Sequence, residues 1–284
     1  MNYFEKYREV YPNLLKISEE VWKFVDDLIK KENNALIIAE KIEEKIKELG
    51  AKPAFPVNIG INNVAAHFTP EQDVFIKEND IVKIDFGIHI DGFIFDTAKT
   101  YGKENNVVKA AKKAFEECLK EIKEGTKVKI FGEICEEVAK EFDVKPVRNL
   151  GGHGLGYYEI HTEPTILNGK NNSNFVLEKG MPIAFEVFMS NGEGKVKDSF
   201  PSTIFQIINP TKIKHLRIYN EILEDAYKKF LTLPFSKRWL NYPKHKIDFA
   251  ISEGIRLGIV KEYPVLKEIE NSVVAQFEST FIVE

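Results

Sequence analysis

Two aspartates on neighbouring predicted strands are spaced so that their carboxylates could bind a metal ion together. Residues 81–90 (IVKIDFGIHI) and 93–100 (FIFDTAKT) read as strands, and the Asp-Gly pair at 91–92 predicts a tight hairpin turn between them. With that pair as a two-residue loop, side-chain alternation places Asp85 and Asp96 on one face, roughly 7 to 8 Å apart at the backbone. The residues that would face them are an alanine and a glycine, which leaves room for a metal ion. The same face could instead point to solvent, as charged strand faces usually do.

Further donor side chains of matching type occur in other apolar or glycine-rich segments. His153 and His161 lie in NLGGHGLGYYEIH, Glu186 interrupts the apolar run PIAFEVF, and Glu278 interrupts AQFESTF. A lone glutamate in a strand is more often an edge charge, but one shared site explains these residues more simply than separate accidents. Four carboxylates and one imidazole favour a pair of hard or borderline dications, and a two-metal site is suited to hydrolysis.

Helical and strand-like stretches alternate along the chain and must position these side chains. Apolar spacing predicts helices within residues 4–49, 106–142 and 209–262, and short β-rich runs predict strands within 55–100, 147–208 and 272–284. The first helical stretch should divide at 33–34 and end at Gly50, and the second should divide at 125–126. This order indicates the α+β class. The Lys-rich stretch 209–262 reads as a helical insertion, because the strand after it is of the same kind as the earlier ones.

Composition and charge favour a cytoplasmic globular protein. Its 284 residues carry 40 Lys and Arg against 44 Asp and Glu, so the net charge of -4 argues against a specific nucleic-acid binder. The hydrophobic share of 43% excludes a disordered chain, and no apolar run approaches the length of a membrane span. The charged N-terminal stretch lacks the features of a secretory signal. Cys118 and Cys135 show no paired spacing, so both are expected to be reduced packing residues.

The five metal-type donors resemble, in identity and order, the ligands of the pita-bread aminopeptidases. They are Asp85, Asp96, His153, Glu186 and Glu278. Three features resemble the type 2 methionine aminopeptidases in particular. His153 and His161 are eight residues apart, and residues 55–70 (FPVNIGINNVAAHFTP) resemble the segment with the catalytic histidine, here His67. The two glutamates are separated by 91 residues, room for the helical insertion that type 1 enzymes lack.

The resemblance covers nearly the whole chain and implies the α+β pita-bread fold with a type 2 helical insertion. Residues 233–240 (LPFSKRWL) and 258–264 (GIVKEYP) are similar to family segments within the insertion, and the N-terminus is similar to the archaeal form. The implied organisation is a catalytic domain of residues 1–204 and 264–284, with the insertion subdomain at 205–263.

The resemblance also implies a role for each donor at two divalent metal ions, Co, Mn, Fe or Zn. Asp85 would bind the first ion, Asp96 and Glu278 would bridge both, and His153 with Glu186 would complete the second. A water whose pKa the two cations lower would attack the first peptide carbonyl, and Glu186 would accept its proton.

The resemblance implies that two histidines and an apolar pocket would bind the peptide substrate. His161 would hydrogen-bond the carbonyl oxygen as charge develops, and His67 would lie near the scissile nitrogen. The residues that match the methionine pocket of the family, beside these two histidines, are Phe55, Ile160, Phe188 and Tyr263. Their alternative role is ordinary core packing. Val187 and Ser279 stand where the family usually has Pro and His. The resemblance therefore does not determine the residues that surround the metal ligands or the shape of the methionine pocket.

The implied activity is removal of the initiator methionine when the second residue is small. The expected partner is the N-terminal Met of nascent polypeptides, bound by a cytoplasmic monomer with no membrane contact and no specific nucleic acid. Lys212, Lys214 and Arg217 are candidates for a transient contact with the ribosome.

Two other functions stay open on the sequence alone. An Xaa-Pro peptidase on the same fold is suggested by residues 152–156 (GHGLG) and 161–164 (HTEP), which resemble prolidase segments. A metal-free pita-bread protein that binds RNA or ribosomes is the other alternative, although such relatives have lost ligands that this chain keeps. Three histidines without a motif partner are expected to be surface or structural residues: His89, His215 and His245.

Overall fold

The computed structural model describes residues 2–211 and 217–284. Its helices are α1 (Tyr3–Leu28), α2 (Ala35–Glu48), α3 (Asn106–Leu119), α4 (Lys129–Glu141), α5 (Arg217–Phe230) and α6 (Lys244–Arg256), with a short 3-10 helix, η1 (Lys237–Trp239). Its strands are β1 (Lys52–Pro53), β2 (Asn58–Ile61), β3 (Val64–Ala66), β4 (Val82–Ile90), β5 (Phe93–Tyr101), β6 (Lys145–Pro146), β7 (Gly151–Gly156), β8 (Glu159–Leu167), β9 (Pro182–Ser190), β10 (Lys197–Ile207), β11 (Val260–Lys267) and β12 (Val274–Ile282). The predicted α+β class is confirmed.

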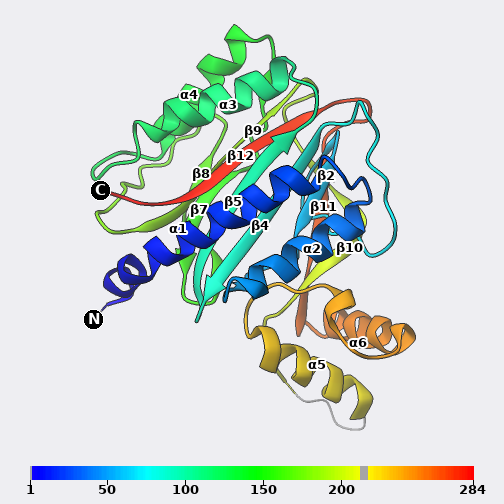
Figure 1. Ribbon diagram of the computed structural model, residues 1–284. Coiled ribbons are helices and arrows are strands. Elements are labelled where there is room, and N and C mark those ends of the chain that lie inside the picture. Colours follow the sequence, from blue (N-terminus) through cyan, green and yellow to red (C-terminus); the bar gives the residue numbers. More distant parts are fainter. Residues whose placement is uncertain (1, 212–216) are drawn as a thin grey trace.

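Two antiparallel sheets carry these strands. The larger, nine-stranded sheet runs in the order β1-β4-β5-β12-β9-β7-β8, with β2 beside β4 and β6 beside β9. The smaller sheet runs β10-β11-β3. The last strand of the chain, β12, lies between β5 and β9 in the middle of the larger sheet (Figure 1). The C-terminal strand therefore joins two halves of the sheet that are distant in sequence.

Two pairs of helices cover one face of the larger sheet (Figure 1). α1 packs against β4 and β5, and α2 against β1 and β2, whereas α3 packs against β9 and β12, and α4 against β6 and β8. Ile84, Phe86 and Ile88 of β4 are buried in the core beneath the first pair. Since side chains alternate along a strand, Asp85 and Gly87 point to the opposite face. That face is the one available for a polar site.

Asparagine side chains begin three of the helices. Oδ1 of Asn2, Asn34 and Asn105 accepts a main-chain N–H from the first turn of α1, α2 and α3, respectively, which satisfies donors that the helix leaves free. Asn34 lies at the predicted division of the first helical stretch. Gly50, with φ 85°, follows α2 and ends that stretch as predicted.

The β4–β5 hairpin has the register that its turn predicts. Both residues of the turn at 91–92 adopt positive φ angles, 47° and 87°, as a two-residue hairpin loop requires. Asp85 pairs with Ala98, and Asp96 pairs with Gly87. The two aspartates therefore share the face of the sheet that the helices leave free.

Helices α5 and α6 form a lobe at one side of the body (Figure 1). Its apolar core is built from residues between 205 and 260, among them Phe205, Tyr219, Phe235 and Ile251. The lobe leaves the body after β10 and returns through β11, and these two strands pair with each other. The boundaries at 205 and 263 stay a prediction.

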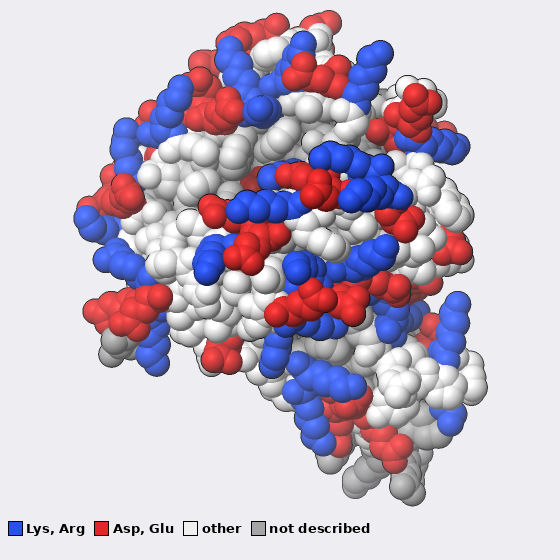
Figure 2. Space-filling model, in the orientation of Figure 1, with Lys and Arg blue, Asp and Glu red and all other residues white. Residues whose placement is uncertain are grey.

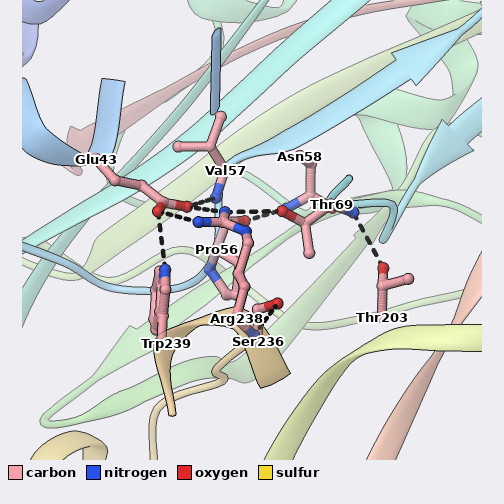
Figure 3. Close-up of polar contacts among 9 residues, drawn as sticks. All are labelled: Glu43, Pro56, Val57, Asn58, Thr69, Thr203, Ser236, Arg238 and Trp239. Atoms are coloured by element: carbon pink, nitrogen blue, oxygen red, sulfur yellow. Dashed lines mark hydrogen bonds and ion pairs between the residues drawn. The ribbon is translucent and has the colours of Figure 1, made fainter. Parts of the chain in front are cut away.

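A buried ion pair joins this lobe to α2 (Figure 3). Glu43 accepts two hydrogen bonds from the Arg238 guanidinium and one, at 2.8 Å, from the Trp239 indole N–H. The same carboxylate accepts the main-chain N–H of Val57 at 3.1 Å, and Arg238 donates to Oγ1 of Thr69 at 3.1 Å. The Glu43–Arg238 pair thus joins the lobe to two loop segments of the body.

The cysteines and histidines that were expected to have only packing or surface roles lie in the core or at the surface wherever the structure describes them. Cys118 and Cys135 are buried and free, in the core beneath α3 and α4. His89 is buried and His245 is exposed, whereas His215 lies outside the described residues. Among the helices of the described ranges, none has both the length and the apolar character that a bilayer crossing requires.

Candidate metal centre

One cavity between the larger and the smaller sheet collects the residues predicted to do chemistry. The predicted residues that line it are Phe55, His67, Asp85, Asp96, His153, Ile160, His161, Glu186, Phe188, Tyr263 and Glu278. The larger sheet supplies the carboxylates, and the smaller sheet supplies part of the opposite wall. The fold therefore brings together, from segments spread along most of the chain, every side chain that the sequence analysis proposed as a catalytic residue, a metal ligand or part of the methionine pocket.

Strand register lines up three of the four carboxylates. One row of directly paired residues crosses β2, β4, β5, β12 and β9. In order, its members are Asn58, Asp85, Ala98, Glu278 and Glu186. Asp96 lies two residues before Ala98 and so on the same face. Because neighbouring strands are roughly 5 Å apart, four carboxylates from four strands come within reach of shared cations.

His153 approaches the carboxylates because glycines flank it on β7. A Cβ on Gly152 would lie 2.5 Å from a carbonyl oxygen of β9, and one on Gly154 would lie 2.1 Å from a carbonyl oxygen of β8. Nδ1 of His153 lies 3.1 Å from the Gly154 carbonyl oxygen, which holds the proton on Nδ1 and leaves the Nε2 lone pair free. Nε2 lies 3.8 Å from Oδ2 of Asp96.

Asp96, His153 and Glu278 form a group with the spacing of metal ligands. Each is buried and offers one ligand atom, and these three atoms lie within 4.8 Å of one another. Ligand atoms at roughly 2.1 Å from one ion are up to roughly 4 Å apart, so small side-chain rotations would complete the coordination. The group therefore marks the centre of the site.

Burial raises the pKa of every carboxyl group at this centre. Desolvation raises the pKa of Asp85 to about 7, partly offset by a hydrogen bond from Gln276. Desolvation, and after it the charges of neighbouring carboxylates, raises the pKa of Asp96, Glu186 and Glu278 well above the ordinary range. Four such groups repel one another when ionised, so the protein by itself favours their protonated forms.

The donor set fits divalent cations. Oδ1 of Asp85 and Oδ1 of Asp96 are buried and have no hydrogen-bond partner among the described residues. Buried carboxylate oxygens without a partner are costly, and a bound dication removes both that cost and the mutual repulsion. Oxygen donors joined by one imidazole suit Mn, Fe, Co or Zn.

Histidine rings surround the carboxylates. The ring centroids of His153 and His161 are 4.4 Å apart, and His67 meets the Tyr263 ring edge-on at 5.4 Å. Desolvation lowers the pKa of His67 to about 4. His161 is exposed by surface area, but desolvation of its ring in the cavity, and after it the charges of His153, His67 and Lys261, lower its pKa well below the ordinary value. Both imidazoles are therefore neutral near pH 7, and each has one N–H to donate.

His67 follows β3 in a strained conformation. Its φ angle is 61°, in the left-handed region of the backbone that residues other than glycine rarely adopt. Its Nδ1 is buried and has no partner within the described chain. Strain of this kind persists where the surroundings hold it, and it is concentrated at functional sites.

Threonine hydroxyls bridge β5 and β12 on both sides of Glu278. Oγ1 of Thr100 accepts the N–H of Gln276 at 2.8 Å and donates to its carbonyl at 2.7 Å. Oγ1 of Thr280 accepts the N–H of Asp96 at 2.7 Å and donates to its carbonyl at 2.9 Å. These two strands share one directly paired position, at Glu278. Each hydroxyl thus takes the place of a main-chain group in the ladder beside the ligands.

Two amide side chains at the centre were not predicted. Nε2 of Gln276 donates to Oε2 of Glu186 at 3.1 Å and to Oε2 of Glu278 at 3.3 Å. Asn58 lines the cavity, and its Oδ1 is buried without a partner in the described part of the chain. Gln276 lies two residues before Glu278, so strand alternation could have revealed it. Asn58 joins the site through pairing with β4, which no local pattern signals.

Aromatic and aliphatic side chains form the apolar wall of the cavity. Phe55, Ile160, Phe188 and Tyr263 are all buried there. The Phe55 ring covers Gly87, because a Cβ on that glycine would lie 2.3 Å from a ring carbon. The expectation that the space beside this glycine holds a metal ion is therefore wrong, since the ring fills it.

Val187 and Ser279, which depart from the family pattern, point away from the cavity. Val187 is fully buried in the core beneath α3 and α4. Ser279 lies between Phe277 and Phe281, which pack against the same core. The two departures therefore alter the helix-covered face of the sheet and leave the lining of the cavity intact.

Comparisons with known proteins identify the family. Residues 12–226 match metallopeptidase family M24. A methionine aminopeptidase of Archaeoglobus fulgidus is 43% identical over 253 residues, which cover 88% of this chain and 86% of that protein. A solved structure of a thermophilic Arx1 has the same fold, with a TM-score of 0.84 at 20% identity over 97% of this chain and 87% of that one.

A methionine aminopeptidase of Thermotoga maritima also shares the fold, with a TM-score of 0.60 at 22% identity over 88% of this chain and 82% of that one. The pita-bread fold expected from the sequence is thereby confirmed. Of the three functions weighed on the sequence, the comparisons favour the first. The chain therefore belongs to metallopeptidase family M24 and, within it, to the methionine aminopeptidases.

Proposed function

We propose that this protein removes the N-terminal methionine from nascent polypeptides whose second residue is small, with two divalent metal ions as its cofactor. The observation that carries the proposal is the convergence of four carboxylates, two buried and two half-buried, with His153 and two neutral histidines in one cavity beside an apolar wall. The activity is also the one named for the similar protein of Archaeoglobus fulgidus.

Five side chains hold the ions in this proposal. Asp85, Asp96, His153, Glu186 and Glu278 would together hold the two ions. When bound, the ions supply Lewis acidity, which polarises a peptide carbonyl and lowers the pKa of a water molecule. The Nε2 lone pair of His153 is the free one, because Nδ1 is bonded to the Gly154 carbonyl.

Three residues move or hold protons during hydrolysis. Glu186 would accept the proton of the attacking water and return it to the departing amine. His161 donates its N–H to the carbonyl oxygen as negative charge develops there. His67 lies beside the scissile nitrogen. Because both imidazoles have lowered pKa values and are neutral, neither adds positive charge next to the cations.

The methionine side chain packs against the apolar wall formed by Phe55, Ile160, Phe188 and Tyr263. A thioether is apolar and polarisable, so it packs favourably against aromatic rings. The preference for a small second residue rests on the resemblance of the chain to its family.

The proposed partner is the N-terminal Met of a nascent chain. In this proposal the protein binds it in the cytoplasm as a monomer. A transient contact with the ribosome through Lys212, Lys214 and Arg217 remains part of the proposal. Lys212 and Lys214 lie outside the described residues, and so does the side chain of Arg217.

A peptide assay joined to metal analysis tests the proposal. Metal-loaded protein should release Met from Met-Ala-Ser, and Glu278→Gln should lower kcat/KM at least about 100-fold and reduce the metal bound per chain. The control Glu19→Gln changes an exposed carboxylate of α1 and should leave both quantities unchanged. A wild-type protein that binds no divalent metal and releases no Met would overturn the proposal, and preferred cleavage of an Xaa-Pro dipeptide would support the prolidase alternative.

A further inference from the structure

A second cavity lies where the lobe of α5 and α6 meets the body. Its volume is about 390 Å³, within the range of small-molecule sites, and it shares no lining residue with the cavity at the metal centre. Its walls come from the end of α2, from β1 and β4, from the end of α5 and the loop after it, and from η1. The lining residues that matter here are Lys47, Lys52, His89, Lys229, Phe230 and Trp239.

Positive charge dominates the lining. Lys47 and Lys52 are exposed, and neither forms an ion pair with any described residue. Lys229 is paired with Asp225 at 2.8 Å, and the charge of Arg238 is balanced by Glu43. No Asp or Glu of the described chain lines the cavity. In Figure 2, Lys and Arg side chains gather where the lower lobe joins the body, with acidic side chains interleaved among them.

His89 adds a hydrogen-bond donor to this lining. The residue is 6% exposed, and its Nδ1 accepts the main-chain N–H of Gly92 at 3.2 Å. The proton of the neutral ring is therefore on Nε2, at the opposite edge, where it has no partner among the described residues. The Tyr158 ring lies edge-on to the imidazole at 5.5 Å and restrains it. Burial and the charge of Lys52 lower the pKa of His89 to about 4, which keeps the ring neutral.

Aromatic rings make the other side of the cavity apolar. Phe230 and Trp239 are half-buried, with ring centroids 5.3 Å apart. The indole N–H of Trp239 is already bonded to Glu43, so the ring offers apolar surface alone. A bare inorganic anion would leave this surface and most of the volume unused. The lining therefore suits an anionic head attached to a flat, apolar body.

We propose that this cavity binds a phosphate-bearing small molecule of nucleotide size. Lys47, Lys52 and the Nε2–H of His89 hold the phosphate, because charged and N–H donors form the strongest hydrogen bonds to phosphate oxygens. Phe230 and Trp239 pack against the apolar body. A polynucleotide would need a basic groove that continues beyond these residues, so the volume favours a small molecule. The proposal does not rest on the peptidase function.

Calorimetric titration of the full-length, metal-loaded protein with AMP tests this proposal. AMP should bind with one-to-one stoichiometry, and the Lys47→Ala/Lys52→Ala double variant should raise its Kd about tenfold or more. His89→Leu should weaken binding as well, whereas His89→Gln keeps an N–H donor and should bind nearly as the wild type does. Lys16→Ala changes an exposed lysine of α1 outside the cavity and should leave the Kd unchanged.

Titrations with two fragments of AMP test the phosphate-binding and the apolar side of the cavity separately. Inorganic phosphate and adenosine should each bind more weakly than AMP, because each lacks one half of the recognised chemistry. The double variant should release Met from Met-Ala-Ser at the wild-type rate, which shows that it is folded. The proposal fails if AMP does not saturate the protein at millimolar concentration, if the double variant binds AMP with an unchanged Kd, or if a single-stranded RNA binds while AMP does not.

Discussion

Gln276 is a neutral side chain among the central carboxylates. Its amide donates to Glu186 and Glu278, so it orients both and spreads their negative charge. Gln276→Leu should lower kcat/KM for Met-Ala-Ser about 10- to 100-fold and weaken the binding of Mn²⁺ to metal-depleted protein, as followed by calorimetry. Gln72→Leu, at an exposed loop position, is the control. Unchanged metal affinity in Gln276→Leu would contradict this role.

His89 makes the stability of the protein depend on pH. Its folded-state pKa of about 4 lies below the ordinary value of 6.5, so its contribution is present above pH 6.5 and is lost as the pH falls toward 4. Between pH 7.5 and 5 this group should remove about 2 kcal/mol from the free energy of unfolding. His89→Leu should lack this loss. Urea unfolding of both proteins at both pH values measures the difference, and equal losses would refute the assignment.

Single residues were predictable where their type conflicts with their surroundings. Glu186 and Glu278 each interrupt an apolar strand, and His153 stands among glycines, so a shared polar site was the simplest explanation. Asn58 and the position of the Phe55 ring gave no such signal. Both depend on how a loop and a short strand pack against β4, which is a tertiary contact.

At the scale of elements, the Glu43–Arg238 pair is the link between α2 and the lobe (Figure 3). Arg238→Met leaves the buried carboxylate without its cation and should lower the free energy of unfolding by about 3 to 5 kcal/mol. Urea unfolding measures this loss. The KM for Met-Ala-Ser should also rise, because Thr69 and Val57, held by the same network, lie close in sequence to His67 and Asn58.

Two further variants of this network separate charge from packing. Glu43→Gln/Arg238→Met removes both charges and should be less destabilised than Arg238→Met alone. Arg256→Met, which breaks an exposed pair with Glu253 in the same lobe, should leave the free energy of unfolding nearly unchanged. Equal losses for Arg238→Met and Arg256→Met would show that the buried pair has no special role.

Local elements followed from local patterns, whereas the pairing of distant strands did not. The β4–β5 register was predictable because the turn at 91–92 fixes it. The position of β12 between β5 and β9, and the smaller sheet that joins β3 to β10 and β11, involve strands up to about 200 residues apart in sequence. Such pairings are decided by which faces bury one another.

At the scale of the whole molecule, the buried carboxylates should make stability depend on metal. A ligand that binds the folded state alone stabilises it, by about 2.7 kcal/mol at a concentration 100 times its Kd. Adding Mn²⁺ to metal-depleted protein should therefore raise the Tm by a few degrees in a scanning calorimeter. Asp96→Asn should abolish the increase, and Asp27→Asn, at an exposed position of α1, should preserve it. An increase that survives in Asp96→Asn would place the stabilising ions elsewhere.

The hydroxyl bridges of Thr100 and Thr280 have a consequence for how such a centre changes over evolutionary time. Where main-chain ladders join two strands, most side-chain substitutions leave the separation of the strands unchanged. Here β5 and β12 are joined beside the ligands by two threonine hydroxyls. A single substitution at position 100 or 280 can therefore change the distance between the two strands. We therefore expect substitutions at these two positions to change which ion is preferred while each coordinating residue stays the same.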